Sequence, residues 1–388
     1  MKLNKVLTHA AMALSIALTL RPCMGQSQPH GRTSSSHSHF GSIPGGQAVE
    51  KVFLVNDLGM RVAYIDYACT ITSMEVPDNN GTFKNIILNL PTLSDYLKTN
   101  RRYAAVIGRY AGRIAAGRYE LGGKVYSLPT NPNGAALHSD PNGFDKRVWN
   151  RLDFDEPTSL GSVYTLQSPD GDQGHPGNVT VKVKYELMRK QNEFRITYQA
   201  VTDQATVMTL TNHAFMNLAG AGAHGLSTHL FQVLANEFVE VNDKKLPSGR
   251  LLPVNETALN LNQATNISRF LTEPSTLLGS PPGYDHTLVL QDNGGRLQTA
   301  VVVIEQESGR TLTIKTTEPA IQFNTGNGFN KEEIGGEGVA YDIHDGFAME
   351  TFHLPDSPNQ AHFPSAVITA EKPLYSQTVY SFGTVIKR

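Results

Sequence analysis

The sequence predicts an all-β protein, built as a large antiparallel β-sandwich. The clearest observation is segment 179–187, in which apolar residues alternate with threonine and charged residues, so that one face of a strand is apolar. A polar turn follows, and a second alternating segment, 194–200, completes a hairpin. The sequence shows no alternation of strands with long helices and no internal repeat, which argues against a parallel α/β sheet. Its 34 glycines and 21 prolines favour many turns and few long helices.

Length and charge limit the number of domains and the kinds of partner. The chain has 388 residues, a length at which an all-β domain can remain undivided, and we expect one domain over residues 47–388. Lysine and arginine number 33 against 35 aspartates and glutamates, so the formal net charge is −2. Such a balance predicts no electrostatic attraction to nucleic acids or to anionic membranes.

Residues 1–25 have the pattern of a signal peptide. Lys2 and Lys5 supply positive charge, a largely apolar run follows over 6–20, and the small residue Gly25 suits cleavage after it. We therefore expect an exported protein, periplasmic or secreted, that is not held at a membrane once the signal peptide is removed.

Residues 26–46 are rich in serine, glycine, proline and histidine and lack apolar periodicity, which predicts a disordered linker. Its histidines could bind a metal ion, but no carboxylate or cysteine completes a ligand set, so a polar spacer is the preferred interpretation. Acylation of Cys23, as in a lipoprotein, is an alternative to cleavage after Gly25. Arg21 and Pro22 are unfavourable residues just before such a cysteine.

Further strands are expected where short apolar or alternating runs lie between turn residues. These runs are 61–65, 231–241, 300–305 and 311–315. Only segment 92–98 has a helical pattern, and it is short.

Two residues stand out chemically. His213 lies among apolar residues and side-chain amides, and Glu350 is the lone acid of an apolar run. An imidazole and a carboxylate in apolar surroundings can exchange protons in both directions near neutral pH. We therefore hypothesise that His213 and Glu350 form a general acid/base pair. Each could instead be structural, and His286 or His353 could supply the working imidazole.

Six segments, taken together, resemble the aldose 1-epimerase, or galactose mutarotase, family. They occur in the family's order and span most of the chain from about residue 50 to the C-terminus. The segments are GRYAGRI at 108–114, GFDKRVW at 143–149, LTNHAFMNL at 210–218, GYDH at 283–286, IQFNTGN at 321–327 and ETFHLPDSPN at 350–359.

The resemblance implies an antiparallel β-sandwich of the galactose mutarotase-like kind, a supersandwich with an open sugar-binding cleft. It implies interconversion of the α and β anomers of free aldohexoses such as glucose and galactose, without a cofactor or a metal ion. The implied partner is the small aldose substrate and no nucleic acid, and the implied assembly is a monomer or weak dimer.

The resemblance also implies roles for individual positions. His213 matches the histidine taken as general acid, and Glu350 matches the carboxylate taken as general base. Four other positions match residues that hold the sugar hydroxyls and the ring oxygen: Arg113, His138, Asp285 and Gln322.

Two positions depart from the family pattern. Gly112 stands where the family usually has asparagine, so a hydroxyl contact could be lost or rerouted. Ser139 and Asp140 stand where two glycines usually follow the histidine at position 138, so that loop could take a different path.

Two other functions stay open at this point. An epimerase of phosphorylated hexoses would need a basic cluster for the phosphate, which Arg101 and Arg102 could supply. A non-catalytic sugar-binding protein would keep the cleft without turnover, although both proton-transfer positions carry the expected residue types.

Overall fold

The structure is a computed structural model, and it describes residues 33–291 and 294–385. The predicted signal peptide, residues 1–25, lies outside the described residues, and so do residues 26–32. In the part of the chain that is described, no helix is both long enough and apolar enough to span a membrane.

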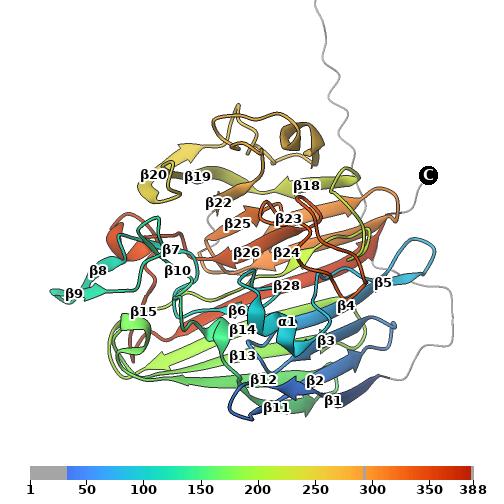
Figure 1. Ribbon diagram of the computed structural model, residues 1–388, viewed down its shortest axis with the longest axis horizontal. Helices are drawn as coiled ribbons and strands as arrows, with labels where there is room; N and C mark the ends of the chain where they lie inside the picture. The colour runs from blue at the N-terminus through green and yellow to red at the C-terminus, as the bar shows by residue number, and fades with distance from the viewer. Residues whose placement is uncertain (1–32, 292–293, 386–388) are drawn as a thin grey trace, which may run out of the picture.

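The largest sheet among the described residues has nine antiparallel strands, and we call it the large sheet (Figure 1). The predicted hairpin lies within it as β13 and β14, and the alternating apolar residues of segments 179–187 and 194–200 are buried. In spatial order its strands are β11 (Asn150–Asp155), β12 (Ser159–Ser168), β13 (Val179–Met188), β14 (Glu193–Thr202), β28 (Leu374–Thr384), β24 (Arg310–Thr316), β23 (Gln298–Glu305), β18 (His229–Val233) and β21 (Thr265–Asn266).

A second antiparallel sheet, which we call the site sheet, has six strands in the described chain. Its spatial order is β17 (Phe215–Met216), β26 (Phe347–Phe352), β25 (Ala320–Asn324), β22 (Asp285–Leu290), β19 (Ala235–Val241) and β20 (Pro247–Pro253). The run 231–241, predicted as one strand, is therefore two. It breaks at Leu234, whose N–H donates to the carbonyl oxygen of Ala300, and the chain passes there from the large sheet to the site sheet.

The N-terminal sheet has five strands in the described part of the chain: β1 (Ser34–Ser42), β2 (Ala48–Val55), β3 (Arg61–Ile65), β4 (Ile71–Pro77) and β5 (Phe83–Asn85). The prediction of a disordered linker over 26–46 is wrong for most of its described part, because β1 pairs with β2 from Ser34 to Ser42. Most side chains of β1 are exposed, and main-chain hydrogen bonds hold it, so this edge strand has no apolar periodicity to detect. Phe40 packs against Tyr96, with 6.3 Å between the ring centroids.

Shorter elements connect the sheets. The predicted helix is α1 (Leu93–Lys98), capped by Thr92, whose side chain accepts from the N–H of Asp95. Two-stranded ladders join β6 (Val106–Ile107) to β16 (Thr211–Asn212), β7 (Arg113–Ala115) to β10 (Ala135–Leu137), β8 (Arg118–Leu121) to β9 (Lys124–Ser127), and β15 (Thr206–Val207) to β27 (Val367–Ile368). Short 3₁₀ helices are Phe144–Lys146, Asp172–Gly174, Ser268–Leu271 and Ser357–Asn359.

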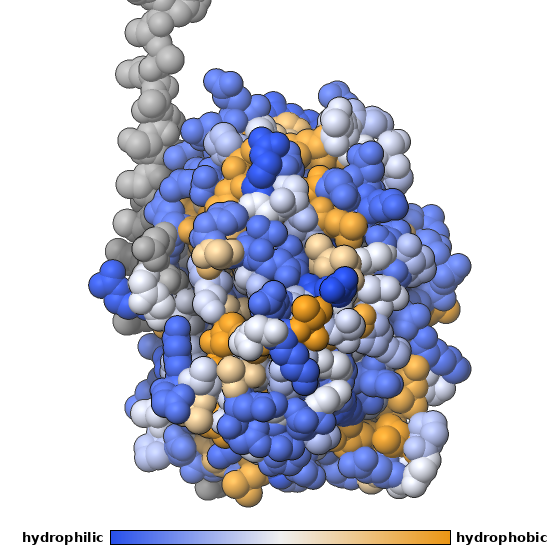
Figure 2. Space-filling model, turned by 90° about the vertical axis from the view of Figure 1, so that its left-hand side faces the viewer, coloured by the Kyte–Doolittle hydropathy of each residue, from blue (hydrophilic) through white to orange (hydrophobic). Residues whose placement is uncertain are grey.

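The hydrophobic core lies between the sheets. One cluster of buried apolar residues includes Leu54 of the N-terminal sheet, Val183 of the large sheet and Phe323 of the site sheet. The three sheets therefore pack on a shared interior, as a sandwich requires. Figure 2 shows the face at the end of the molecule where β8 and β9 project; it is mostly hydrophilic, with apolar residues in small groups.

Candidate active site

Three adjacent strands of the site sheet place polar side chains in one row. Gln322 of β25 lies opposite Glu350 of β26, and Thr287 of β22 lies opposite Gln322. Residues opposite each other share a face of the sheet, and so does Asp285, two positions before Thr287. Thr287 Oγ1 donates to Gln322 Oε1 over 2.6 Å, and Gln322 Nε2 donates to Asp285 Oδ1 over 2.7 Å. The row holds two carboxyl groups with a fixed amide between them.

His213 reaches this row from the short ladder of β6 and β16. Its N–H donates to the carbonyl oxygen of Ala105, and the N–H of Ala104 donates to its carbonyl oxygen, both over 2.9 Å. The next strand, β17, pairs with β26. This path brings His213 Nε2 to 3.5 Å from Glu350 Oε1. Both side chains are largely buried, with 13% and 4% exposed.

His138 and Arg113 come from the ladder of β7 and β10, where Leu137 lies opposite Arg113. The N–H of Gly112 donates to His138 Nδ1 over 3.1 Å. A neutral imidazole that accepts at Nδ1 carries its proton on Nε2, so His138 is a hydrogen-bond donor at Nε2. Its ring lies edge to face against the ring of His213, with 5.6 Å between the centroids.

The structure accounts for the glycine at position 112. Its φ is +87°, and a Cβ added there would lie 2.7 Å from Cε2 of Phe352. An asparagine at this position would therefore clash unless Phe352 moved. The aromatic ring of Phe352 thus lies against the backbone of Gly112.

Arg113 approaches the far end of the row, where its Nη2 lies 3.9 Å from Asp285 Oδ2. Asn324 Nδ2 also donates to Asp285, over 3.3 Å. Neither Asn324 nor Thr287 was predicted as a site residue from the sequence. The strand pattern could have identified them. Each lies two residues after a predicted site residue, and residues two apart on a strand share a face.

The environment shifts the pKa of the two central groups in opposite directions. Burial, together with the negative charge of Asp285, raises the pKa of Glu350 to about 8, against the opposing effect of Arg113 and Arg102. Burial, assisted by the positive charge of Arg102, lowers the pKa of His213 to about 4. At neutral pH the pair therefore holds one proton, which rests on Glu350.

The other two titratable residues of the site are held in defined states. Burial and the charges of Arg102 and Arg113 lower the pKa of His138 well below its ordinary value, so the ring is neutral. Although burial opposes ionisation, Arg113 and other positive neighbours lower the pKa of Asp285, so it is a carboxylate.

Ligand atoms of His138, His213 and Glu350 lie within 4.8 Å of one another, as in a metal site. The hydrogen bond from Gly112 makes His138 a poor ligand, because one ring nitrogen accepts that bond and the other carries the proton. Only two ligands then remain, fewer than metal sites usually have.

The two alternative histidines, His353 and His286, interact with other groups of the protein. His353 Nδ1 lies 2.8 Å from Glu318 Oε2, in a buried ion pair. His286 Nδ1 accepts from the N–H of Asp285, and its Nε2 lies 3.1 Å from the carbonyl oxygen of Leu277. Of these histidines, His213 is the one that faces Glu350.

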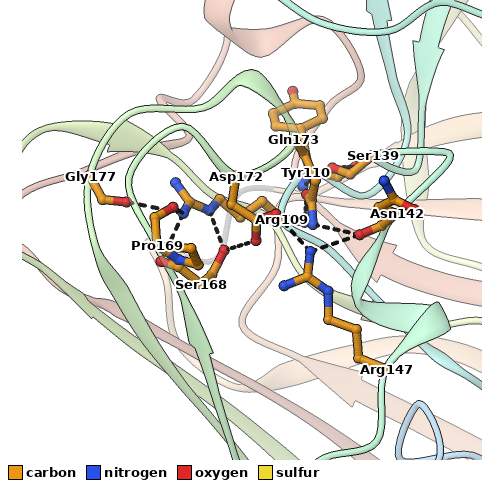
Figure 3. Close-up of polar contacts among 10 residues, drawn as sticks. All are labelled: Arg109, Tyr110, Ser139, Asn142, Arg147, Ser168, Pro169, Asp172, Gln173 and Gly177. Carbon is orange, nitrogen blue, oxygen red and sulfur yellow. Dashed lines mark hydrogen bonds and ion pairs between the residues drawn. The ribbon is translucent and has the colours of Figure 1, made fainter. Parts of the chain in front are cut away.

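Arg109, in the segment that leads to Arg113, is a structural anchor (Figure 3). Its guanidinium is buried and donates over 2.8–3.0 Å to Ser168 Oγ and to four carbonyl oxygens, those of Ser168, Pro169, Pro176 and Gly177. The next residue, Tyr110, donates its N–H to Ser139 Oγ over 2.9 Å. These bonds fix the backbone shortly before Arg113 and directly after His138.

An open pocket of about 290 Å³ adjoins the row at the end away from His213. Polar groups of Arg113, Asp285, Gln322 and Lys245 line it, together with valines of β19 and two prolines. The structure thus brings all six sequence-predicted site residues together around one surface of the site sheet.

Comparison with known proteins shows which family the sequence matches. The profile of the aldose 1-epimerase family matches residues 50–381. The galactose mutarotase of Sus scrofa is 35% identical over 335 residues, which are 86% of this chain and 94% of that protein. The aldose 1-epimerase of Escherichia coli K12 is 34% identical over 322 residues, 83% of this chain and 91% of that protein.

A solved structure confirms the predicted fold. The galactose 1-epimerase from Lactobacillus acidophilus superimposes with a TM-score of 0.79 over 92% of this chain and 100% of that one, at 23% identity. The profile match and the relatives above 30% identity cover most of the sequence, and they lead to one conclusion: this chain belongs to the aldose 1-epimerase family of isomerases.

Proposed function

We propose that the chain interconverts the α and β anomers of free aldohexoses, with His213 as general acid and Glu350 as general base. The observation that carries the proposal is the 3.5 Å approach of His213 Nε2 to Glu350 Oε1 in largely buried surroundings. The anomeric hydroxyl and the ring oxygen of a sugar are bonded to the same carbon. An acid and a base that serve both atoms must therefore lie side by side.

Ring opening needs two proton transfers. The carboxylate of Glu350 takes the proton of the anomeric hydroxyl, and the imidazolium of His213 gives a proton to the ring oxygen. The bond between C1 and the ring oxygen breaks as the carbonyl forms. Rotation about C1–C2 presents the other face of the aldehyde, and the reverse transfers close the ring. Positioned acid/base groups contribute roughly 10²–10⁴-fold each.

The protonation state of the free pair suits this cycle. It holds one proton between pH values of about 4 and 8. Moving that proton from Glu350 to His213 produces the carboxylate and imidazolium that ring opening uses. The hydroxyls of a bound sugar favour this form, since they donate to the carboxylate.

The remaining side chains suit a polyhydroxylated substrate. Asp285 is a carboxylate that accepts from hydroxyls, and Gln322 is held rigidly beside it. Arg113 donates through its planar fork, and His138 donates through Nε2. We propose that these four residues hold the hydroxyls and the ring oxygen.

Polarimetry of freshly dissolved α-D-glucose and α-D-galactose tests the proposal. Wild-type protein should accelerate equilibration, and His213→Asn and Glu350→Gln should remove most of the acceleration while remaining folded. The matched control is His224→Asn, because the side chain of His224 is 63% exposed and pairs with Asp345. Unaltered rates in either site variant would remove that residue from the mechanism.

Phosphorylated hexoses are not the favoured substrates. Arg101 Nε lies 2.7 Å from Glu333 Oε2, and Arg102 forms ion pairs with Asp140 and Asp145. Both guanidinium groups are thus already paired with carboxylates of the protein, which compete with a phosphate for them.

We also propose that the protein is exported, with support from the sequence of residues 1–25 alone. N-terminal sequencing of the full chain secreted by its producing cells should begin at Gln26. A retained Met1 would contradict export by cleavage, and a lipid on Cys23 would indicate the lipoprotein alternative.

A further inference from the structure

Arg102 forms a clamp with two carboxylates, and we call this group the Arg102 clamp. Arg102 Nη2 pairs with Asp140 Oδ2, and Arg102 Nε lies 3.4 Å from Asp145 Oδ2. We propose that Arg102 is a positioning residue of the reaction, which fixes His138 relative to His213 and sets a permanent positive charge beside the acid/base pair. The inference rests on the function proposed for that pair.

The clamp is tied to His213 through the main chain. The carbonyl oxygen of Arg102 accepts from the N–H of Ala105 over 3.0 Å, which closes a turn. The residues of that turn, Ala104 and Ala105, then exchange two main-chain hydrogen bonds with His213. Any movement of the Arg102 backbone is therefore transmitted to the backbone that carries this imidazole.

The clamp is tied to His138 through Asp140, two residues further along. His138 and Ser139 both have left-handed backbone conformations, with φ of 55° and 60°. L-residues adopt this conformation at a cost, so surrounding contacts must hold the loop in place. The ion pair of Asp140 with Arg102 is one such contact, and it uses a side chain where the family usually has glycine.

Asp145 is the second carboxylate of the Arg102 clamp. Its carboxyl group is 1% exposed and lies in the 3₁₀ helix that follows the His138 loop. A buried carboxylate needs an ionic partner, and it has two, Arg102 and the ammonium group of Lys146 at 3.6 Å. The Arg102 side chain is itself only 11% exposed. Its Nη2 donates a hydrogen bond to Asp140, and its Nε lies within ion-pair distance of Asp145 without a hydrogen bond.

The charge of Arg102 acts on the site groups as well. It lowers the pKa of His138, of His213 and of Glu350. Other charged groups act on Glu350 from the elements packed against it: Asp285 of β22 raises its pKa, and Arg113 of β7 lowers it. Tyr380 of β28 also faces Glu350 but stays neutral, since burial raises its own pKa.

The test compares the pH dependence of kcat/KM for wild type, Arg102→Met, Arg102→Lys and Asp140→Asn. Loss of the positive charge in Arg102→Met should move both limits of the profile to higher pH by about one unit. Arg102→Lys should keep the wild-type limits, because it keeps the charge. Asp140→Asn should lower kcat/KM without raising either limit, because it loosens the His138 loop and leaves the charge.

The matched control is Arg101→Met. Arg101 is the adjacent arginine and is also paired, with Glu333 and Asn330, but it is not among the main charges that shift the pKa of His213 and Glu350. Its removal should leave both limits unchanged. A purely structural role for Arg102 predicts lower activity with wild-type limits in Arg102→Met, and that result would overturn the inference.

Two further measurements keep the inference testable. Arg102→Met could fail to fold, because Asp145 loses the guanidinium beside it. In that case the double variant Arg102→Met/Asp145→Asn should still show both pH limits of kcat/KM moved to higher pH. If wild type shows no mutarotation, the proposed function fails, and NMR titration of the His213 ring still tests the clamp. An unchanged His213 pKa in Arg102→Met would then refute it.

Discussion

Asp285 and Glu350 project from the same face of the site sheet, one on each side of β25, and their pKa values are displaced in opposite directions. Asp285 is stabilised as a carboxylate by Arg113, whereas burial and the charge of Asp285 keep Glu350 protonated at neutral pH. In the proposed mechanism the two carboxyl groups have different tasks: Asp285 accepts hydrogen bonds from sugar hydroxyls, and Glu350 exchanges a proton.

This relationship predicts the pH dependence of the reaction. kcat/KM should rise as the pH increases through about 4 and fall as it increases through about 8, because the pair is singly protonated between these values. Initial rates at low sugar concentration, from pH 3 to pH 10, would measure both limits. A profile with a single rise near the ordinary pKa of histidine would contradict the assignment.

Replacing Asp285 by asparagine should move both pH limits of kcat/KM to lower pH. Its negative charge raises the pKa of both Glu350 and His213, so its removal lowers both. The lost carboxylate acceptor should also raise KM by roughly tenfold or more. Steady-state kinetics across pH measure both effects, with the exposed Asp243→Asn as the control. An unchanged KM would show that Asp285 does not bind the sugar.

Glu350→Gln should make the protein more stable in alkaline solution while it abolishes activity. The unfolded chain loses the Glu350 proton near pH 4.5, whereas the folded protein keeps it until about pH 8. Wild-type stability from this group is therefore complete below pH 4.5 and is lost as the pH rises toward 8. Glutamine cannot ionise, so the variant avoids a loss on the order of 5 kcal/mol.

Urea denaturation at pH 4 and at pH 9 measures this difference. The two proteins should have similar stability at pH 4, and the variant should be the more stable at pH 9. The control Glu120→Gln changes an exposed carboxylate and should show no such dependence. A variant that is less stable than wild type at pH 9 would argue against a neutral, buried Glu350.

Arg109→Met should destabilise the protein by about 3 kcal/mol or more, because the carbonyl oxygens that surround its guanidinium would lose their donors. The free energy of unfolding in urea measures the loss. The control Arg118→Met alters an exposed arginine and should cost little. Comparable losses in the two variants would contradict the role of Arg109 as an anchor.

Several parts of the fold followed from local patterns. The hairpin of β13 and β14 and the strand β3 were predicted from alternation, and α1 from its short helical segment. β1 was missed because its side chains are exposed, and a strand held by main-chain hydrogen bonds leaves no hydrophobic pattern. The break at Leu234 was missed because two successive strands in different sheets read as one continuous run.

In the candidate site, too, some residues could be predicted from local sequence patterns and others could not. His213 and Glu350 could be identified from the sequence by residue type and by the resemblance of their segments to one family. The positioning role proposed for Arg102 could not be predicted from the sequence. It depends on ion pairs with Asp140 and Asp145, which lie about 40 residues away in the chain. Two adjacent arginines look alike in a sequence, and only their partners separate Arg101 from Arg102.

By itself, the sequence determined the all-β class, the family and the six residues that meet at the site, because alternation and short motifs are local properties of the chain. The tertiary structure decided which groups share a proton and how the charges around them act. Those properties depend on burial and on distances between residues far apart in the chain, such as the 3.5 Å between His213 and Glu350. The pairing of Arg102 with the His138 loop arises in the same way.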